Sequence, residues 1–469
     1  MRKRLILIAC LCFLPLLSWA GWPGDPTVNL RVTNDLNVST FFAVPDGAGG
    51  MIVIWILENG DVYARRVKVD GTLGDIIMVS ANPYAYVASY LYAASDGSGN
   101  ALIVWKRYNE KVEGGTTYYY REIWAQKITP DGTKLWGNGV LVYQHKSTFQ
   151  LYAVDKPIIA PDGLGGAVVA WYEGPKKALN VYDDVDVYAR GIDSSGSLIG
   201  SDRIVVTDKT GNQLWFNSRK GPNIASDGAG GVYLAWWDES DGQMHLNRID
   251  PSTGKLWASD QTLDLYRGAY ITSPLFSLVE TPGGVIVVYS RQRGIHAKKY
   301  AADGKTISGA YRGFPPEDAN FDEVAGIIGC PDGTGGAYIA FNVEYGSIIR
   351  VGAQRFFFDG SDWTMWSDHV YALDVSELPY SHDTPFIVRT SDGGAVFTWE
   401  DERDCHTTGR DIYAQKISAD GNALWIKNGV KVCGAAENQR YVMAVSDGAG
   451  GVIIAWLDAR GSTDVYAQR

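Results

Sequence analysis

The chain has 469 residues, of which 54 are glycine and 16 are tryptophan, and only 20% are charged. This composition excludes a disordered chain, which is rich in charge and poor in aromatic residues, and it argues against a helical protein, because glycine disfavours helix interiors. A net charge of −11 repels phosphate backbones, so we expect no nucleic acid partner.

The first twenty residues predict an export signal. Three basic residues, Arg2 to Arg4, precede an apolar run from Leu5 to Leu17, and Ser18-Trp19-Ala20 places small residues at positions −3 and −1 of a cleavage site. The run is shorter than the about 20 residues that span a bilayer, and no later segment is long and apolar enough. We therefore expect residues 1–20 to be a signal peptide and residues 21–469 to form one domain. The protein would be exported without a membrane span, to the periplasm, the cell surface or the medium.

One repeat unit recurs along the rest of the chain. It reads Asp-Gly-x-Gly-Gly, four apolar or small residues, an aromatic residue, a variable loop, Asp-Val-Tyr-Ala-Gln/Arg and a second turn. The aromatic residues lie 50 to 66 residues apart and are Trp55, Trp105, Trp171, Trp236, Tyr289, Phe341, Trp399 and Trp456. Asp-Gly between two strand-like runs is a strong hairpin signal. A period near fifty, built of strands, predicts a propeller or a related array.

The two ends of the chain indicate how the array closes. The sequence holds eight first turns but seven second turns, and the eighth unit stops at Arg469 without a fourth strand. The segment from Thr27 to Val32 resembles the outer strands of other units and can supply the missing strand. We therefore predict an all-β fold: a single closed eight-bladed β-propeller whose N-terminal strand completes the C-terminal blade. A solenoid is the alternative, but it needs capping units at both ends, and none is visible.

The Asp-Gly-x-Gly-Gly…Trp…Tyr-Ala-Gln pattern resembles the propeller repeats of exported bacterial proteins, most of which have no assigned function. This resemblance covers nearly all of the chain after residue 20 and implies the same fold. The segment from Ser418 to Trp425 also resembles the Asp-box of sialidase-type propellers. In this chain, however, Gly421 follows Asp420 directly, and the sialidase arginine triad and Phe-Arg-Ile-Pro motif are missing. Sialidase chemistry is therefore not implied.

The loops predict one variable face. In a propeller the first and second turns lie on one face, and they are nearly uniform here. The loops between the second and third strands and between blades lie on the opposite face and differ in length and composition. Variable loops on a rigid frame often carry binding, and the loop aromatics that we select as candidate ligand-binding residues are Tyr84, Tyr86, Tyr119, Trp215 and Tyr266. They would suit sugar rings or extended peptides, or they only pack over the ends of the blades.

A Trp-x-Asp-x-Arg motif gives four further candidate ligand-binding residues. Asp401 and Arg403 follow Trp399, and Asp458 and Arg460 follow Trp456. One interpretation is a ring of carboxylates and guanidinium groups that grips a polar ligand. The other is structural: the aspartate caps a turn and the arginine bridges to a neighbouring blade. Recurrence between repeats favours the structural interpretation.

Cysteine and histidine positions complete the inventory of reactive groups. Cys405 and Cys433 map to the variable face of one unit, so an exported protein could join them in a disulfide, with Cys330 left free. The six histidines are scattered without metal-ligand spacing, and no Gly-x-Ser-x-Gly elbow occurs. We expect no metal and no cofactor, and we select no catalytic residue.

These observations favour a monomeric, non-enzymatic exported protein that binds a glycan, a peptide or a partner protein through its variable face. Two other functions remain open. One is a polysaccharide-acting hydrolase or lyase with a carboxylate site at the mouth of the central channel. The other is a purely structural role in a cell-surface layer.

Overall fold

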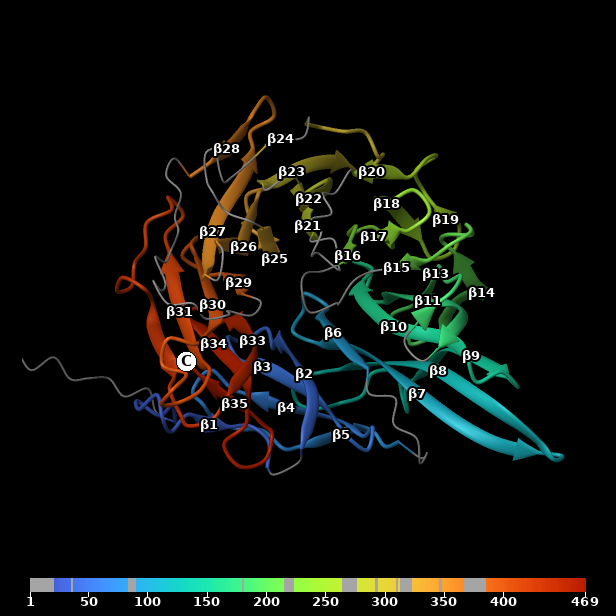
Figure 1. Cartoon of the computed structure of the whole chain (residues 1–469), viewed down its shortest axis with the longest axis horizontal. Coiled ribbons are helices and arrows are strands. Elements are labelled where there is room, and N and C mark those ends of the chain that lie inside the picture. Colours follow the sequence, from blue (N-terminus) through green and yellow to red (C-terminus); the bar gives the residue numbers. More distant parts are fainter. Residues whose placement is uncertain are drawn as a thin grey trace, which may run out of the picture.

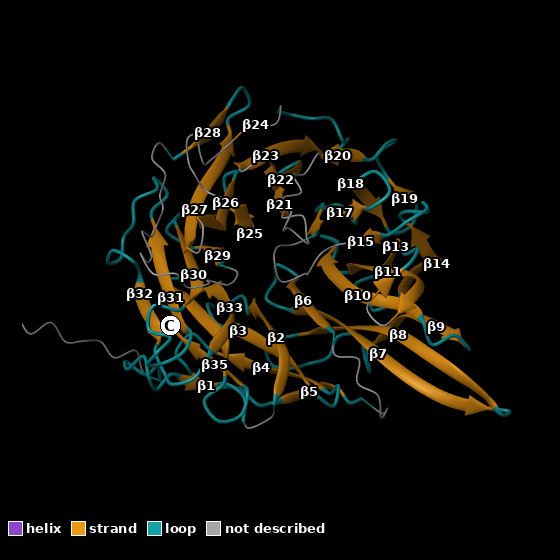
Figure 2. Ribbon diagram, in the orientation of Figure 1, coloured by secondary structure: helices purple, strands orange, loops and turns teal. Residues whose placement is uncertain are grey.

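The computed structural model describes residues 21–34, 37–82, 90–178, 181–214, 223–263, 276–291, 294–308, 311–312, 323–345, 348–366 and 385–469. The fold is all-β: eight antiparallel sheets are arranged in a ring as an eight-bladed β-propeller (Figure 1). Figure 2 shows strands and loops without a helix among the described residues. Within the same residues, no helix is long and apolar enough to cross a membrane.

Each blade holds at least four strands, and the first four blades follow the chain. Blade 1 consists of β2 (Val38–Pro45), β3 (Met51–Leu57), β4 (Val62–Val67) and β5 (Ile77–Ser80). Blade 2 consists of β6 (Leu91–Ser95), β7 (Ala101–Glu113), β8 (Thr116–Ile128) and β9 (Val140–Ser147). Blade 3 consists of β10 (Tyr152–Pro161), β11 (Ala167–Ala178), β12 (Val181–Tyr182), β13 (Asp186–Ile192) and β14 (Leu198–Val205). Blade 4 consists of β15 (Gln213–Leu214), β16 (Ile224–Ser226), β17 (Val232–Asp238), β18 (Gln243–Asp250), β19 (Gly254–Lys255) and β20 (Gln261–Leu263).

The other four blades continue around the ring to the closing blade. Blade 5 consists of β21 (Phe276–Thr281), β22 (Gly284–Arg291), β23 (Gly294–Ala301) and β24 (Tyr311–Arg312). Blade 6 consists of β25 (Glu323–Pro331), β26 (Ala337–Tyr345), β27 (Ile348–Phe358) and β28 (Trp363–Met365). Blade 7 consists of β29 (Phe386–Arg389), β30 (Ala395–Asp401), β31 (Asp411–Ile417) and β32 (Val430–Cys433). Blade 8 consists of β33 (Gln439–Ser446), β34 (Val452–Asp458), β35 (Asp464–Gln468) and β1 (Leu30–Arg31).

Blade 8 confirms the predicted closure, because its outer strand comes from the start of the chain. Strand β1 pairs antiparallel with β35, with Leu30 opposite Ala467 and Arg31 opposite Tyr466. The observed strand is shorter than the predicted Thr27–Val32 segment, but the backbone of Val32 still donates to the carbonyl of Val465 at 2.8 Å. The hydrogen-bonded edge between the first and last blades is thereby covered.

The aspartate of the Asp-Gly-x-Gly-Gly turn has a structural task. In blade 1, Oδ1 of Asp46 accepts hydrogen bonds from the backbone of Ala48 at 2.8 Å and of Gly50 at 2.7 Å, and Oδ2 accepts one from Arg66 of β4 at 2.7 Å. Gly47 adopts a φ of 75°, which glycine tolerates without a steric penalty. The same pattern recurs at Asp227, Asp332 and Asp447. These turns are therefore scaffold, and they account for much of the glycine.

The recurring tryptophans form the core between blades. All six, Trp55, Trp105, Trp171, Trp236, Trp399 and Trp456, are at most 1% exposed. In three blades the ring stacks on the tyrosine of the Asp-Val-Tyr-Ala or Asp-Ile-Tyr-Ala segment in the next strand, as Trp55 does on Tyr63 with centroids 5.8 Å apart. Burying such large side chains is the main apolar contribution to stability, so these residues are not available to a ligand.

Candidate functional site: the surface between blades 2 and 3

The structure describes one of the five loop aromatics selected from the sequence. Tyr84, Tyr86, Trp215 and Tyr266 lie outside the described residues. Tyr119 lies in β8, where it is half-buried and stacks on Tyr108 with ring centroids 6.3 Å apart. The β7–β8 hairpin that carries both tyrosines has thirteen residues in each strand and projects from the ring at the lower right of Figure 1.

The Trp-x-Asp-x-Arg residues form closed structural units. Asp401 is fully buried, accepts a hydrogen bond from Trp399 at 2.8 Å, and accepts two from the Arg403 guanidinium at 2.9 and 2.6 Å. That guanidinium lies over the ring of Tyr413, 3.9 Å from its centroid. Because the carboxylate is shielded from solvent and engaged by both neighbours, this geometry favours the structural interpretation.

Blade 8 repeats this unit and uses it to hold the N-terminus. Asp458 is fully buried and pairs with Arg460 through hydrogen bonds of 2.9 and 2.7 Å. The same guanidinium donates to the carbonyl of Thr27 at 2.6 Å and to the side chain of Asn29 at 2.9 Å. Arg460 therefore bridges the two ends of the chain.

The predicted Cys405–Cys433 disulfide is absent from the structure, in which Cys330, Cys405 and Cys433 are free thiols. Cys433 is buried beneath the closing segment, where its Sγ lies 3.0 Å from Oδ1 of Asn29 and 3.2 Å from the Arg460 guanidinium. Burial raises the pKa of the Cys433 thiol to about 12. The side chain is thus directed at the N-terminal segment, a contact that the repeat pattern within blade 7 does not reveal.

A different group of side chains meets between blades 2 and 3, and its centre is Glu173 at the end of the β11 core. Glu173 is 2% exposed. Its Oε1 accepts hydrogen bonds from the hydroxyls of Tyr143 in β9 at 2.7 Å and Tyr152 in β10 at 3.0 Å. Its Oε2 lies 3.3 Å from Nε of Arg203 in β14. Four strands of two blades therefore converge on one carboxylate.

Aromatic rings surround this carboxylate. His145 of β9 lies with Nδ1 3.6 Å from Oε1 of Glu173 and stacks on Tyr152, with ring centroids 3.9 Å apart and planes within 5°. The Arg203 guanidinium lies over Tyr188 at 4.5 Å and over Tyr143 at 4.7 Å from the centroids. We call these six residues (Tyr143, His145, Tyr152, Glu173, Tyr188 and Arg203) the blade 2–3 cluster. All but Glu173 are partly exposed, so the cluster presents aromatic and charged groups to solvent.

Electrostatics keep the cluster charged. Burial alone would raise the pKa of Glu173, but hydrogen bonds from His145 and Tyr143 and the charge of Arg203 lower it overall. Burial, together with the Glu173 charge, raises the pKa values of Tyr143 and Tyr152. At neutral pH the glutamate is therefore a carboxylate, and both tyrosines are neutral hydrogen-bond donors.

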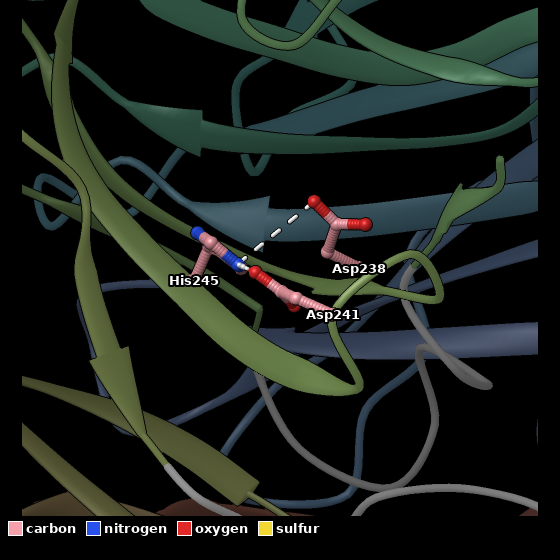
Figure 3. Close-up of side chains that lie close together, drawn as sticks. All are labelled: Asp238, Asp241 and His245. Carbon is pink, nitrogen blue, oxygen red and sulfur yellow. Dashed lines mark hydrogen bonds and ion pairs between the residues drawn. The ribbon is translucent and has the colours of Figure 1, made fainter. Parts of the chain in front are cut away.

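A second group, in blade 4, offers metal-ligand atoms (Figure 3). Asp238, Asp241 and His245 each place one such atom within 4.8 Å of the others. His245 Nε2 lies 2.8 Å from Oδ2 of Asp241 and 3.9 Å from Oδ2 of Asp238. The ammonium of Lys209 already lies 2.9 Å from Oδ2 of Asp238, and both oxygens of this carboxylate accept hydrogen bonds.

The protonation of His245 also opposes a metal ion at this position. Burial would lower the pKa of His245, but Asp260 and Asp241 raise it overall. The Lys209 ammonium already pairs with Asp238, and the raised pKa of His245 makes a proton harder to remove from its imidazole. A metal ion would therefore have to displace the ammonium and compete with that proton.

None of the residues of the blade 2–3 cluster is among the candidates selected from the sequence. One signal was present, because Glu173 occupies the aspartate position of the Trp-x-Asp-x-Arg motif while Pro175 replaces the arginine that would pair with it. Blade 4 shows the same departure, with Asp238 followed by Ser240. In both blades a histidine lies beside the carboxylate instead. Partners such as Tyr143 and Arg203 come from strands far apart in the sequence, and no local pattern marks them.

Comparison with known proteins assigns the chain to no family. No protein-family model matches the chain, and no curated protein matches it. Among solved structures, the chain resembles an ulvan lyase of polysaccharide lyase family PL25, at 9% identity and a TM-score of 0.43, over 96% of this chain and 94% of that one. It also resembles the NanB sialidase of Streptococcus pneumoniae, at 8% identity and a TM-score of 0.35, over 94% of this chain and 93% of that one. The lectin SapL1 is similar at 14% identity and a TM-score of 0.31, over 73% of this chain and 100% of that one.

Proposed function

We propose that this protein is an exported β-propeller that binds a glycan through its variable face, at the blade 2–3 cluster. The proposal is supported by the side chains that meet at this cluster. Three tyrosine rings, one histidine ring, one arginine and one buried carboxylate come together there from five strands of two blades. The strand ends that bring them together belong to the face where we expect variable loops.

The chemistry of the cluster fits a sugar better than an apolar ligand. A pyranose has one apolar face that stacks on an aromatic ring, and hydroxyls at its edge that exchange hydrogen bonds with charged groups. Tyr188 and Tyr152 are half-buried rings, and Arg203 and His145 lie beside them with nitrogen atoms that can hydrogen-bond to hydroxyls. Because Glu173 and its tyrosine partners hold these groups in place, little conformational entropy would be lost on binding.

The same electrostatics weigh against glycoside hydrolysis at this surface. A hydrolase of the usual kind needs one carboxyl group that stays protonated near neutral pH so that it can donate to the leaving oxygen. The pKa of Glu173 is lowered, so this carboxyl group is ionised. A lyase removes a proton instead, so the lowered pKa of Glu173 does not weigh against lyase chemistry at this surface. The alternative of a hydrolase or lyase at the mouth of the central channel stays open.

The test is a glycan and peptide array probed with the purified protein, combined with an assay of polysaccharide breakdown by reducing ends and by the ultraviolet absorbance of unsaturated products. We expect binding to a glycan without turnover. Turnover would replace the binding function by the enzymatic one, and binding confined to peptides would contradict the proposal.

A matched pair of variants locates the site. Tyr188 and Tyr63 occupy the same position in their repeats, and each stacks on its core tryptophan, with centroids 6.3 and 5.8 Å apart. Only Tyr188 lies in the blade 2–3 cluster. We expect Tyr188→Ala to weaken binding of the array's tightest oligosaccharide about tenfold or more, which corresponds to ~1.4 kcal/mol. Tyr63→Ala should leave the affinity within about twofold. Equal losses in titration calorimetry would show that the site lies elsewhere.

A further inference from the structure

A second polar group lies in the same two blades, around Asp155 of β10. The Oδ1 of Asp155 lies 2.9 Å from Nζ of Lys106 in β7, and its Oδ2 lies 3.3 Å from Nζ of Lys176 in β11. The hydroxyl of Tyr182 in β12 donates to Oδ2 at 3.0 Å. The two lysine side chains are 16% and 11% exposed, so both ammonium groups are held largely out of solvent against one carboxylate.

Arg121 of β8 adds a third cation to this group. The residue is 3% exposed, and its guanidinium lies over the rings of Tyr108 and Tyr119, 5.5 and 5.8 Å from their centroids. Its Nη2 donates to the carbonyls of Phe149 and Gln150. Its Nη1 is buried and has no hydrogen-bond partner among the described residues. A buried guanidinium nitrogen without an acceptor is costly and calls for one.

The charges at this position do not balance. Lys106, Lys176 and Arg121 bring three positive charges to one carboxylate, and the backbone of β10 places Lys156 directly after Asp155. Burial lowers the pKa of Lys176 overall; the charge of Asp155 opposes this, and the nearby charges of Lys106 and Arg121 add to it. Burial also lowers the pKa of Arg121, although Asp155 opposes this. This surplus of positive charge is local, because the chain as a whole has a net charge of −11. An added anion would relieve it.

We infer that Lys106, Lys176 and Arg121 form a subsite for an anionic sugar substituent, a carboxylate or a sulfate ester, beside the blade 2–3 cluster. This inference rests on the proposed glycan-binding function and specifies its ligand as an acidic polysaccharide. Arg121 connects the two places: it lies opposite His145 in the register between β8 and β9, and its guanidinium interacts electrostatically with both Tyr152 and Asp155. A sugar bound at the exposed edge of the blade 2–3 cluster would place its neighbour's acidic group near the three cations.

The experiment compares polymers that differ in charge. Titration calorimetry uses polygalacturonate against neutral galactan, and dextran sulfate against dextran, so that the first pair tests a carboxylate and the second a sulfate ester. The variants are Lys176→Gln and its matched control Lys177→Gln. Lys177 follows directly in the sequence but is 65% exposed and pairs with the surface residue Asp183. Lys106→Gln serves as a second variant should Lys176→Gln fail to fold, as judged by circular dichroism.

We expect at least one acidic polymer to bind more tightly than its neutral counterpart, with an affinity that falls as salt rises. Lys176→Gln should weaken that binding about tenfold, and Lys177→Gln should change it less than about twofold. Whichever acidic polymer binds identifies the substituent. Equal binding of neutral and acidic polymers would overturn the subsite and leave glycan binding standing. Equal losses of affinity in Lys176→Gln and Lys177→Gln would mean that the acidic polymer is attracted by the general surface charge and not by a subsite. If no glycan binds, here or on the array, the proposed function itself fails.

Discussion

Two residues after the core tryptophan, four blades carry a carboxylate: Glu173, Asp238, Asp401 and Asp458. Where an arginine follows two residues later, as in blades 7 and 8, the pair is bidentate and closed. Where it does not follow, as in blades 3 and 4, the carboxylate contacts a histidine and a cation from another segment of the chain. The motif itself could be recognised in the sequence, but its meaning depended on which residue replaced the arginine.

The environment of Asp238 in blade 4 predicts a pH effect at His245. Its imidazole is buried, stacks on Trp236, and has its pKa raised above the usual 6.5 by Asp260 and Asp241 despite the opposing effect of burial. A raised pKa means that the folded state binds the proton more tightly than the unfolded state. The stabilisation is therefore complete below the usual pKa and is lost as pH rises through the raised one.

Urea unfolding at a series of pH values measures this contribution. We expect the difference in free energy of unfolding between the wild type and His245→Gln to shrink as pH rises from 6 toward and beyond the raised pKa. A difference that is constant with pH, or that grows, would mean that the histidine is neutral in the folded protein.

At the scale of elements, the ring is held shut by a few contacts of the N-terminal segment. Thr33 is fully buried; its hydroxyl donates to Asp464 at 2.7 Å and accepts from the backbone of Val465 at 2.9 Å. Blade 3 has the same arrangement at Thr207, which accepts from the backbone of Val187 at 2.8 Å and donates to Asp186 at 3.1 Å. The two threonines differ in that only Thr33 joins distant parts of the chain.

This difference predicts distinct outcomes for two equal substitutions. Thr33→Val and Thr207→Val each leave a buried backbone N–H without its acceptor, so each should lower the free energy of unfolding by about 1–3 kcal/mol. Only Thr33→Val should also speed hydrogen exchange in β35 and the N-terminal segment, because it loosens the closure. Exchange in these segments that is the same in both variants would argue against closure through this contact.

At the scale of the whole molecule, the fold could be predicted and the site largely could not. The repeat carries a similar turn and a core aromatic residue eight times, six of them tryptophan, so the number of blades and their closure follow from counting. Within the described part of the chain, the blade 2–3 cluster occurs at one interface between blades, where it joins residues from Tyr143 to Arg203. Pairing of that kind depends on the twist and spacing of neighbouring sheets, which no single repeat encodes. The loop aromatics Tyr84, Tyr86, Trp215 and Tyr266 remain predictions.

Hydrogen–deuterium exchange with and without the tightest-binding oligosaccharide is the most direct test of a glycan site between blades 2 and 3, because it locates the ligand on the ring without any substitution. We expect slowed exchange in β9, β10, β11 and β13, which carry Tyr143, Tyr152, Glu173 and Tyr188. Exchange in the Asp-Gly-x-Gly-Gly turns on the opposite face should not change. Slowed exchange confined to those turns, or to blades 5 to 7, would contradict the assignment of the glycan site to blades 2 and 3.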